Sequence, residues 1–243
     1  MHVAWESMKI LSVDTSTPTC TVGIVNGGRI LAESVDYSGQ THARHLMGMI
    51  DSTLLASGIS VQDIDGFAVV TGPGTFTGLR IGIGTIKGLA FALSKPVVGV
   101  TSLAALAAQA DLPTKWVCSV MDARRNEVYY GLYVSEKGEL QQVGNPLVAP
   151  PSELVKNVHE SCQFIGNGAR LYQEMFEAAL GPLAQFSRSS LDTIQAGTIA
   201  NLALKQFQNN ETQGLHQVAP YYIRRSDAEV HAGNLHSSHP PLS

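Results

Sequence analysis

The chain of 243 residues has a mass of 25.9 kDa, enough for roughly one and a half to two domains with a hydrophobic core. Charged residues make up 15% of the chain, below the usual share of about 25%, so part of the surface is expected to be buried against a partner. The net charge is −4 and no basic stripe is visible, which argues against a protein that grips nucleic acid alone.

Three cysteines lie far apart without a C-x-x-C pair, which indicates reduced core residues rather than a disulfide frame or a zinc site. They are Cys20, Cys118 and Cys162. Residues 66–79 and 96–110 carry no charge, but both runs are shorter than the ~20 residues that span a bilayer. A cytoplasmic protein without membrane contact is therefore expected.

The two ends of the chain are expected to lie outside the fold. Residues 1–7 show no periodicity and precede Met8, which opens the first predicted strand, so we set them aside as an extension. Residues 227–243 are rich in His, Ser and Pro and are expected to form a solvated tail rather than an opportunistic metal site.

The first half of the chain alternates in the order β-β-β-α-β-α-β-α. Asn26-Gly27-Gly28 predicts a tight hairpin turn, and Gly58 ends a helix in the C′ position. An antiparallel hairpin followed by parallel units is typical of a ribonuclease-H-like subdomain. Strands are expected at residues 9–14, 20–25, 30–35, 67–70 and 97–100, and helices at 41–57, 77–93 and 102–109.

A second, shorter and less regular set of elements follows. A turn is predicted at Lys137-Gly138, and Ser152 is expected to cap a helix over residues 152–159. The chain is therefore predicted to fold as two α/β subdomains, residues 8–103 and 104–226. Further strands are expected at residues 116–121, 127–134 and 164–165, and further helices at 169–180 and 198–208.

The segment from Thr71 to Gly88 reads TGPGTFTGLRIGIGTIKG, a glycine-rich loop that leads into a helix. Its glycine spacing matches neither the dinucleotide fingerprint nor the P-loop, so phosphate binding is only weakly indicated. Each interior glycine costs the helix about 0.8–1 kcal/mol, so close approach of another backbone is expected to compensate. That backbone belongs either to the helix over residues 41–57 or to another chain, and the low charge favours a subunit interface.

The helix over residues 41–57 is expected to turn one apolar stripe to the core and a second face to the interface. Two histidines on that face could ligate zinc, but no third ligand is near in sequence, so the interface is favoured. The expected interface residues are His42, His45, Met49, Thr77, Gly78, Arg80, Ile81, Gly82 and Thr85. Gly82→Leu is accordingly expected to block dimer formation while the monomer stays folded.

Polar residues after the first strand are the best candidates for a nucleotide site. Asp14 is followed by Thr15 and Ser16, and a strand-end carboxylate with a hydroxyl-bearing turn can meet Mg²⁺-nucleotide; alternatively, Asp14 only orders its own turn. Asp122 holds the equivalent place in the second half, without a following glycine that would admit a phosphate. These two carboxylates are too few for a two-metal nuclease, and the usual hydrolase and metalloprotease motifs are missing.

Several stretches together resemble the TsaB (YeaZ) family over residues 8–225. The resemblance implies two actin-like subdomains of the actin, sugar-kinase and heat-shock-ATPase (ASKHA) superfamily. The matching stretches are MKILSVDTS from Met8, His42 with Leu46, GPGTFTGLRIG from Gly72, GVTSL from Gly99, MDAR from Met121, EVY from Glu127 and PYYIR from Pro220.

The same resemblance implies a role in placing a threonylcarbamoyl group on N6 of the tRNA adenosine 3′ of the anticodon. In that family TsaB is not the catalyst. It binds the transferase TsaD through helices of the first subdomain, joins the ATPase TsaE in a ternary complex, and forms a homodimer when alone. Contact with tRNA is expected only indirectly, through the complex.

The resemblance also bears on ligands. The metal-binding histidine pair of the TsaD paralogue would follow Ser102, where this chain has LAALAAQ, so neither a metal nor a cofactor is expected. Gly166 and Gly168 are similar to the adenosine-side turn of the superfamily, and with Asp14, Thr15 and Ser16 they would form a vestigial nucleotide site.

The sequence therefore favours a non-catalytic scaffold subunit that holds TsaD in an active form. The alternative is a Mg²⁺-dependent ATPase or sugar-kinase-like phosphotransferase that uses Asp14 and the hydroxyl-bearing turn after it.

Overall fold

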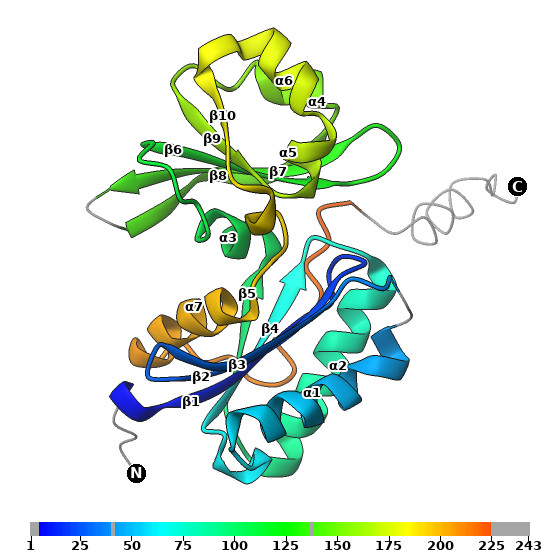
Figure 1. Ribbon diagram of the computed structural model, residues 1–243, viewed down its shortest axis with the longest axis vertical. Helices are drawn as coiled ribbons and strands as arrows, with labels where there is room; N and C mark the ends of the chain where they lie inside the picture. Colours follow the sequence, from blue (N-terminus) through cyan, green and yellow to red (C-terminus); the bar gives the residue numbers. More distant parts are fainter. Residues whose placement is uncertain (1–4, 40–41, 137–138, 225–243) are drawn as a thin grey trace, which may run out of the picture.

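The computed structural model describes residues 5–39, 42–136 and 139–224. They form two lobes, each built on a five-stranded mixed sheet with helices on its faces (Figure 1). The expected fold class, two α/β subdomains of ribonuclease-H-like type, is confirmed.

The first lobe is built on a sheet with strand order β3-β2-β1-β4-β5. β1 pairs antiparallel with β2 and parallel with β4, so the hairpin and the parallel units share the central strand β1. β4 is buried along its whole length, which agrees with the apolar run FAVV at its centre. The strands are β1 (Lys9–Asp14), β2 (Cys20–Asn26), β3 (Arg29–Asp36), β4 (Gly66–Gly72) and β5 (Val97–Thr101).

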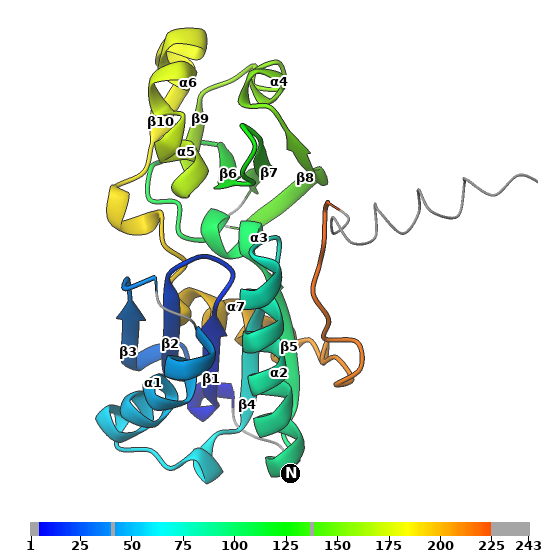
Figure 2. The same ribbon diagram turned by 90° about the vertical axis from the view of Figure 1, so that its right-hand side faces the viewer.

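Helices cover both faces of this sheet. Helices α1 (His42–Ser57) and α2 (Phe76–Leu93) lie side by side on one face, and α7 (Ala196–Gln208) covers the other (Figures 1 and 2). A short 3₁₀ turn, η2 (Val61–Asp63), leads from α1 into β4. The core therefore lies in two layers, one beneath the α1–α2 pair and one beneath α7.

The second lobe has strand order β10-β9-β6-β7-β8, and α3 (Ser102–Ala107) lies between the two sheets. In its core, stacked aromatic rings of Phe164, Phe176 and Phe186 join the sheet to α6 (Gln173–Leu180), and Leu154 packs α4 (Pro151–Val155) into the same cluster. The strands are β6 (Trp116–Asp122), β7 (Val128–Glu136), β8 (Glu139–Ala149), β9 (Cys162–Ile165) and β10 (Ala184–Phe186). The helices are α4 (Pro151–Val155), α5 (Asn167–Leu171), α6 (Gln173–Leu180) and the 3₁₀ turns η3 (Gly181–Leu183) and η4 (Ser189–Leu191).

The second lobe departs from the expected elements more than the first does. It contains two strands that the sequence pattern does not predict, β8 and β10. The sequence pattern also places Ser152 at the cap of α4, whereas Pro150 is the N-cap and Pro151 the first helical residue. The helix expected over residues 169–180 is two helices that meet at Tyr172, where the backbone leaves helical geometry. The turn expected at Lys137-Gly138 lies outside the described residues.

Two further segments differ from expectation. Part of the extension that we set aside belongs to the fold, because Trp5–Ser7 forms the 3₁₀ turn η1 and Trp5 packs on the first lobe's core. Helix α7 falls in the range expected for the second subdomain, yet it packs against the first sheet. The expected boundary at residue 103 between the two subdomains remains a prediction. Of the expected tail, residues 227–243 lie outside the described ranges.

Candidate partner-binding face and interlobe cavity

The side of α2 that carries Gly78 and Gly82 faces the chain's own interior. Both glycines are buried, and a Cβ atom at either position would overlap Thr15, at its backbone carbonyl for Gly78 and at its hydroxyl for Gly82. The Thr15 hydroxyl donates a hydrogen bond of 2.7 Å to the Gly78 carbonyl. These glycines therefore let the turn after β1 approach α2 closely, and they do not lie on the outer face where we expected them.

The outer side of α2 is open and apolar. A Cβ at Gly84 or Gly88 would meet nothing within 4 Å, and Phe91, on the same side, is 77% exposed. Of the expected interface residues, Thr77 is exposed, and Ile81 and Thr85 are half-buried along this side. The residues missed by the expected set are thus Gly84, Gly88 and Phe91.

The apolar composition of α2 makes it the one described helix long and apolar enough to pass a composition test for a membrane span. Core helices pass the same test, and here Leu79, Ile83 and Ile86 pack into the first lobe's core. The helix therefore combines a core-forming side with an open side of small residues.

Helix α1 continues the open face beside α2. His45 and Met49 lie on the side of α1 away from α2, where they line a groove of about 480 Å³ that α1 forms with β3 and that includes Asp36. Two apolar residues that we had not singled out are exposed on this helix, Leu55 at 85% and Met47 at 46%. His42 is the first residue of α1, and its side chain lies outside the described part of the structure.

Arg80 lies at the amino-terminal end of this face, in an aromatic cluster. Its guanidinium lies 3.8 Å from the ring centroid of Phe76, and that ring stacks on Tyr222 at 5.4 Å. The Arg80 Nε donates to the Tyr222 hydroxyl at 3.4 Å. The cluster ties the segment after α7 to α2. Arg80 is therefore exposed but already contacts Phe76 and Tyr222 within the chain.

Between the lobes lies a cavity of about 300 Å³, at the ends of β1 and β6. Ser16 lines it, and the Ser16 hydroxyl is buried without a hydrogen-bond partner among the described residues. Asp14 is buried at 1% exposure, and its carboxylate accepts the Ser16 backbone N–H at 2.7 Å. That contact orders the turn, which is the alternative role that we considered for Asp14.

The opposite wall of the cavity is formed by the β6–β7 turn. Asp122 accepts the Arg124 backbone N–H at 2.8 Å, and its own N–H donates to the Asn167 side chain at 3.1 Å. Residues 124–126 all have positive φ, from 55° to 62°, although none is glycine. Such a run is strained, because the left-handed region costs about 1–2 kcal/mol per residue.

Gly166 and Gly168 do not face the cavity. A Cβ at Gly168 would lie 2.7 Å from the Met121 carbonyl carbon, and one at Gly166 would overlap the Val120 carbonyl oxygen. Both glycines therefore allow the loop after β9 to pack against the end of β6, and of this turn Asn167 lines the cavity. The vestigial nucleotide site is thus not assembled from all the residues we named.

Tyr129 closes the second-lobe side of the cavity. Burial raises the pKa of its phenol above the ordinary value, against the opposing effect of Arg224. Arg224 lies over the ring at 5.9 Å, pairs with Glu127 and donates to the Ala123 carbonyl at 3.1 Å. The phenol is therefore neutral.

Within the described residues, no group of three or more His, Cys, Asp or Glu side chains could hold a metal.

Two mixed sheets of this topology, with a cavity at the ends of their first strands, define a two-lobed protein of the actin-like class. Residues 31–232 match the profile of the TsaD family, described as tRNA N6-adenosine threonylcarbamoyltransferase. The chain is 31% identical, over 92% of its length and 97% of the other's, to the tRNA threonylcarbamoyladenosine biosynthesis protein TsaB of Bacillus subtilis (strain 168). The chain belongs to the TsaB family.

A solved structure agrees with this assignment. YeaZ from Pseudomonas aeruginosa superposes with a TM-score of 0.74 at 32% identity, over 88% of this chain and 99% of that one. The activator of the 2-hydroxyisocaproyl-CoA dehydratase from Clostridium difficile, with a TM-score of 0.52 at 11% identity, shares the fold alone.

Proposed function

We propose that this chain is a non-catalytic scaffold subunit that binds and activates a TsaD-type transferase in the threonylcarbamoylation of tRNA. The Bacillus subtilis relative named above is a biosynthesis protein of tRNA threonylcarbamoyladenosine, which supports a role in that pathway. The transfer itself is proposed to occur on the partner, at the adenosine 3′ of the anticodon. TsaE is proposed to join the pair, and all of this is proposed to take place in the cytoplasm.

The observation that carries the proposal is the open face of α1 and α2. Gly84 and Gly88 leave the backbone of α2 bare, and Leu55 and Phe91 expose large apolar surfaces beside it. Bare helix backbone allows a second helix to approach closely, and an exposed apolar patch favours burial in a protein interface. We propose the same face for the homodimer that forms without the partner, so the two assemblies would compete.

The alternative function, a Mg²⁺-dependent ATPase or sugar-kinase-like phosphotransferase, has less support. It needs Asp14 to reach a metal, whereas this carboxylate is buried and accepts the Ser16 N–H. Gly166 and Gly168 pack on the β6 backbone and do not line the interlobe cavity. We therefore propose that the interlobe cavity does not perform phosphoryl transfer.

The experiment uses Gly84→Leu in place of the Gly82→Leu variant suggested by the sequence. Gly82 contacts Thr15, so a leucine there would disturb the fold, whereas a leucine at Gly84 extends into open space. The substitution also removes a helix glycine, which favours the folded monomer by roughly 0.8 kcal/mol. Ala179→Leu, an exposed position on α6 in the second lobe, is the matched control.

Each variant is mixed with purified TsaD, and the complex is measured by size-exclusion chromatography with light scattering. Modification of tRNA is then measured in a reconstituted reaction. We expect Gly84→Leu to lose both the complex and the modification while its melting temperature stays the same or rises. Ala179→Leu should behave as the unchanged chain. A Gly84→Leu protein that still binds TsaD would overturn the proposed face, and an unchanged chain that never binds it would overturn the function.

A further inference from the structure

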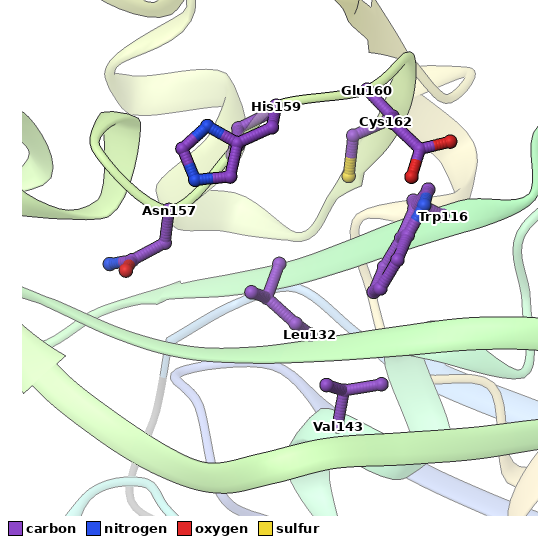
Figure 3. A pocket seen from close by; sticks show the side chains of 8 residues that line it. Trp116, Leu132, Val143, Asn157, His159, Glu160 and Cys162 are labelled. Atoms are coloured by element: carbon purple, nitrogen blue, oxygen red, sulfur yellow. The ribbon is translucent and has the colours of Figure 1, made fainter.

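Two cavities of similar volume differ in the chemistry of their walls. In the cavity of the second lobe, of about 240 Å³, a largely apolar wall is formed by Trp116, Leu132, Val143 and Cys162 (Figure 3). Burial raises the pKa of the Cys162 thiol to about 12, so at neutral pH this group is neutral. The interlobe cavity, of about 300 Å³, is instead lined by polar side chains from both lobes. Its volume is at the small end of the range for ligand sites, so it suits a small metabolite.

Three side chains of the second lobe form a row of polar groups along one wall of the interlobe cavity. Asn167 accepts the Asp122 N–H at 3.1 Å through its Oδ1, which leaves its Nδ2 hydrogens as donors. Asp122 comes next as an acceptor, and the Arg124 Nε lies 3.8 Å from the Asp122 Oδ2. The Arg124 side chain is 75% exposed, so this pair is accessible to a ligand. The wall thus offers, in order, a donor, an acceptor and a positive charge.

The first-lobe wall adds a hydroxyl that the fold does not use. Ser16 is 1% exposed, and its hydroxyl has no hydrogen-bond partner among the described residues. A buried polar group without a partner costs free energy, so a ligand that pairs with it is favoured. The Ser16 backbone is fixed on both sides, because its N–H donates to Asp14 at 2.7 Å and its carbonyl accepts the Thr75 N–H at 2.7 Å. The hydroxyl is therefore held at the cavity wall.

We propose that the interlobe cavity binds a threonylcarbamoyl group, which is a threonine whose nitrogen carries a urea carbonyl. Along this group the carbonyl, the N–H and the carboxylate follow one another as acceptor, donor and anion. That order is the complement of Asn167, Asp122 and Arg124. The threonine hydroxyl branches toward the opposite wall, where it pairs with Ser16. The inference rests on the proposed function, because this is the group that the proposed reaction adds to tRNA.

The test titrates small probes into the nitrogen-15-labelled chain and follows its N–H signals by NMR. The main probe is N-carbamoyl-L-threonine, and N-carbamoyl-L-alanine is a matched probe without the hydroxyl. Ser16→Ala and Arg124→Gln each remove one proposed contact. Arg188→Gln is the control variant, because Arg188 is also 75% exposed and paired with an aspartate, Asp111, but does not line the cavity.

We expect N-carbamoyl-L-threonine to shift the backbone signals of Asp122 and Arg124 and the side-chain N–H signals of Asn167 in a saturable way. The backbone signal of Cys162, in the other cavity, should stay in place. No saturable shift at millimolar probe would overturn the proposal. Shifts of the cavity signals by Mg²⁺-ATP alone would also overturn it, because they would identify a nucleotide site.

The variants test the individual contacts. Ser16→Ala should weaken binding of the threonine probe by about two- to tenfold, the effect of one hydrogen bond, and leave the alanine probe unaffected. Arg124→Gln should weaken both probes by about two- to fivefold, because an exposed ion pair contributes little more than that. Arg188→Gln should change neither. Equal losses for both probes in Ser16→Ala, or an unaltered affinity in Arg124→Gln, would contradict the assigned contacts and overturn the proposal.

A last arm identifies the source of the group. Binding of the nucleoside N6-threonylcarbamoyladenosine at the same residues would support the site and assign the group to modified tRNA. Binding of the free N-carbamoyl acid alone would support the site and assign it to a small-molecule source. Complex formation with TsaD is measured separately on the unchanged chain, so a failure of this site and a failure of the scaffold function are distinguishable.

Discussion

Gly78 and Gly84 illustrate how one residue type serves two purposes on a single helix. At Gly78 the missing side chain makes room for the Thr15 backbone, and at Gly84 it leaves a bare surface. A glycine interior to a helix always carries a conformational cost, so the two positions differ only in what is gained in return. At Gly78 the close packing against Thr15 offsets this cost within the chain. At Gly84 no contact within the isolated chain offsets it.

This difference predicts opposite effects of the same substitution. Gly78→Ala should destabilise the fold by about 1–3 kcal/mol, because its Cβ overlaps the fixed Thr15 carbonyl. Gly84→Ala should stabilise the fold by about 0.8–1 kcal/mol, because open space surrounds the new methyl group. Urea unfolding of both variants measures the two free energies. The account of α2 fails if both substitutions change stability in the same direction.

The sequence predicted a small-residue side for α2 but could not divide its glycines between the interior and the surface. A helical wheel describes the helix alone, whereas Gly78 and Gly82 are buried by the turn after β1. The strand order of the sheet explains why Gly78 and Gly82 face inward. β1 and β4 are parallel neighbours, so the turn that follows β1 must lie beside the start of the helix that follows β4.

At the scale of elements, α7 is the most informative helix. It follows the second lobe in sequence but covers the first sheet, where the Ser12 hydroxyl donates to the Ala196 carbonyl at 2.7 Å. The Glu33 carboxylate accepts the Gly197 backbone N–H at 2.9 Å, a favourable position for an anion at a helix N-terminus. Sequence periodicity predicted this helix but not its place, because several sheet faces could accept the same apolar stripe.

Phe207 tests where α7 belongs. It is 2% exposed and packs beside Gly66 in the first lobe, so Phe207→Ala should cost about 3–5 kcal/mol. Hydrogen exchange followed by mass spectrometry should show faster exchange in β1, β2 and β4. Strands β7 and β8 should exchange at their original rates. Faster exchange confined to the second lobe would contradict the packing described here.

Strand β8 shows why the second lobe was harder to predict. Its sequence, ELQQVGNPLVA, contains Gly144 and Pro146 and lacks regular apolar alternation, so it has the character of a loop. It is a strand because β7 offers a long partner, and the pairing absorbs an irregularity between Tyr130 and Leu132. Long-range pairing of this kind leaves little local signal in a sequence.

At the scale of the whole molecule, Gln109 and Arg224 tie the two lobes together through the segments on either side of α7. The Gln109 amide, 7% exposed, donates to the carbonyls of Leu191 and Thr193 at 2.9 and 3.0 Å and accepts the Gln195 N–H at 2.7 Å. It thereby fastens the segment before α7 to the end of α3. Arg224 makes a second tie, from the segment after α7 to the β6–β7 turn.

Gln109→Leu should separate the stabilities of the two lobes. The substitution leaves three partly buried backbone groups without their partner, at a cost of about 2–3 kcal/mol. Calorimetry should show a lower and broader transition than in the unchanged protein. Gln142→Leu, which removes an exposed glutamine of β8, is the control and should stay within about 0.5 kcal/mol. A single sharp transition at the original temperature would rule out this role for Gln109.

The position of α7 also sets an order of events during synthesis. The strands of the first lobe leave the ribosome early, but the helix that shields one face of their sheet begins only at Ala196. Until then Met8, Ile10 and Ala68 lack part of the cover they have in the finished protein. The strands and helices of the second lobe all precede α7. This lobe can therefore be complete while the first lobe still lacks α7. The lobe that comes first in the sequence is thus the last to be completed, and a nascent chain stalled before α7 would present one uncovered face of the first sheet to chaperones.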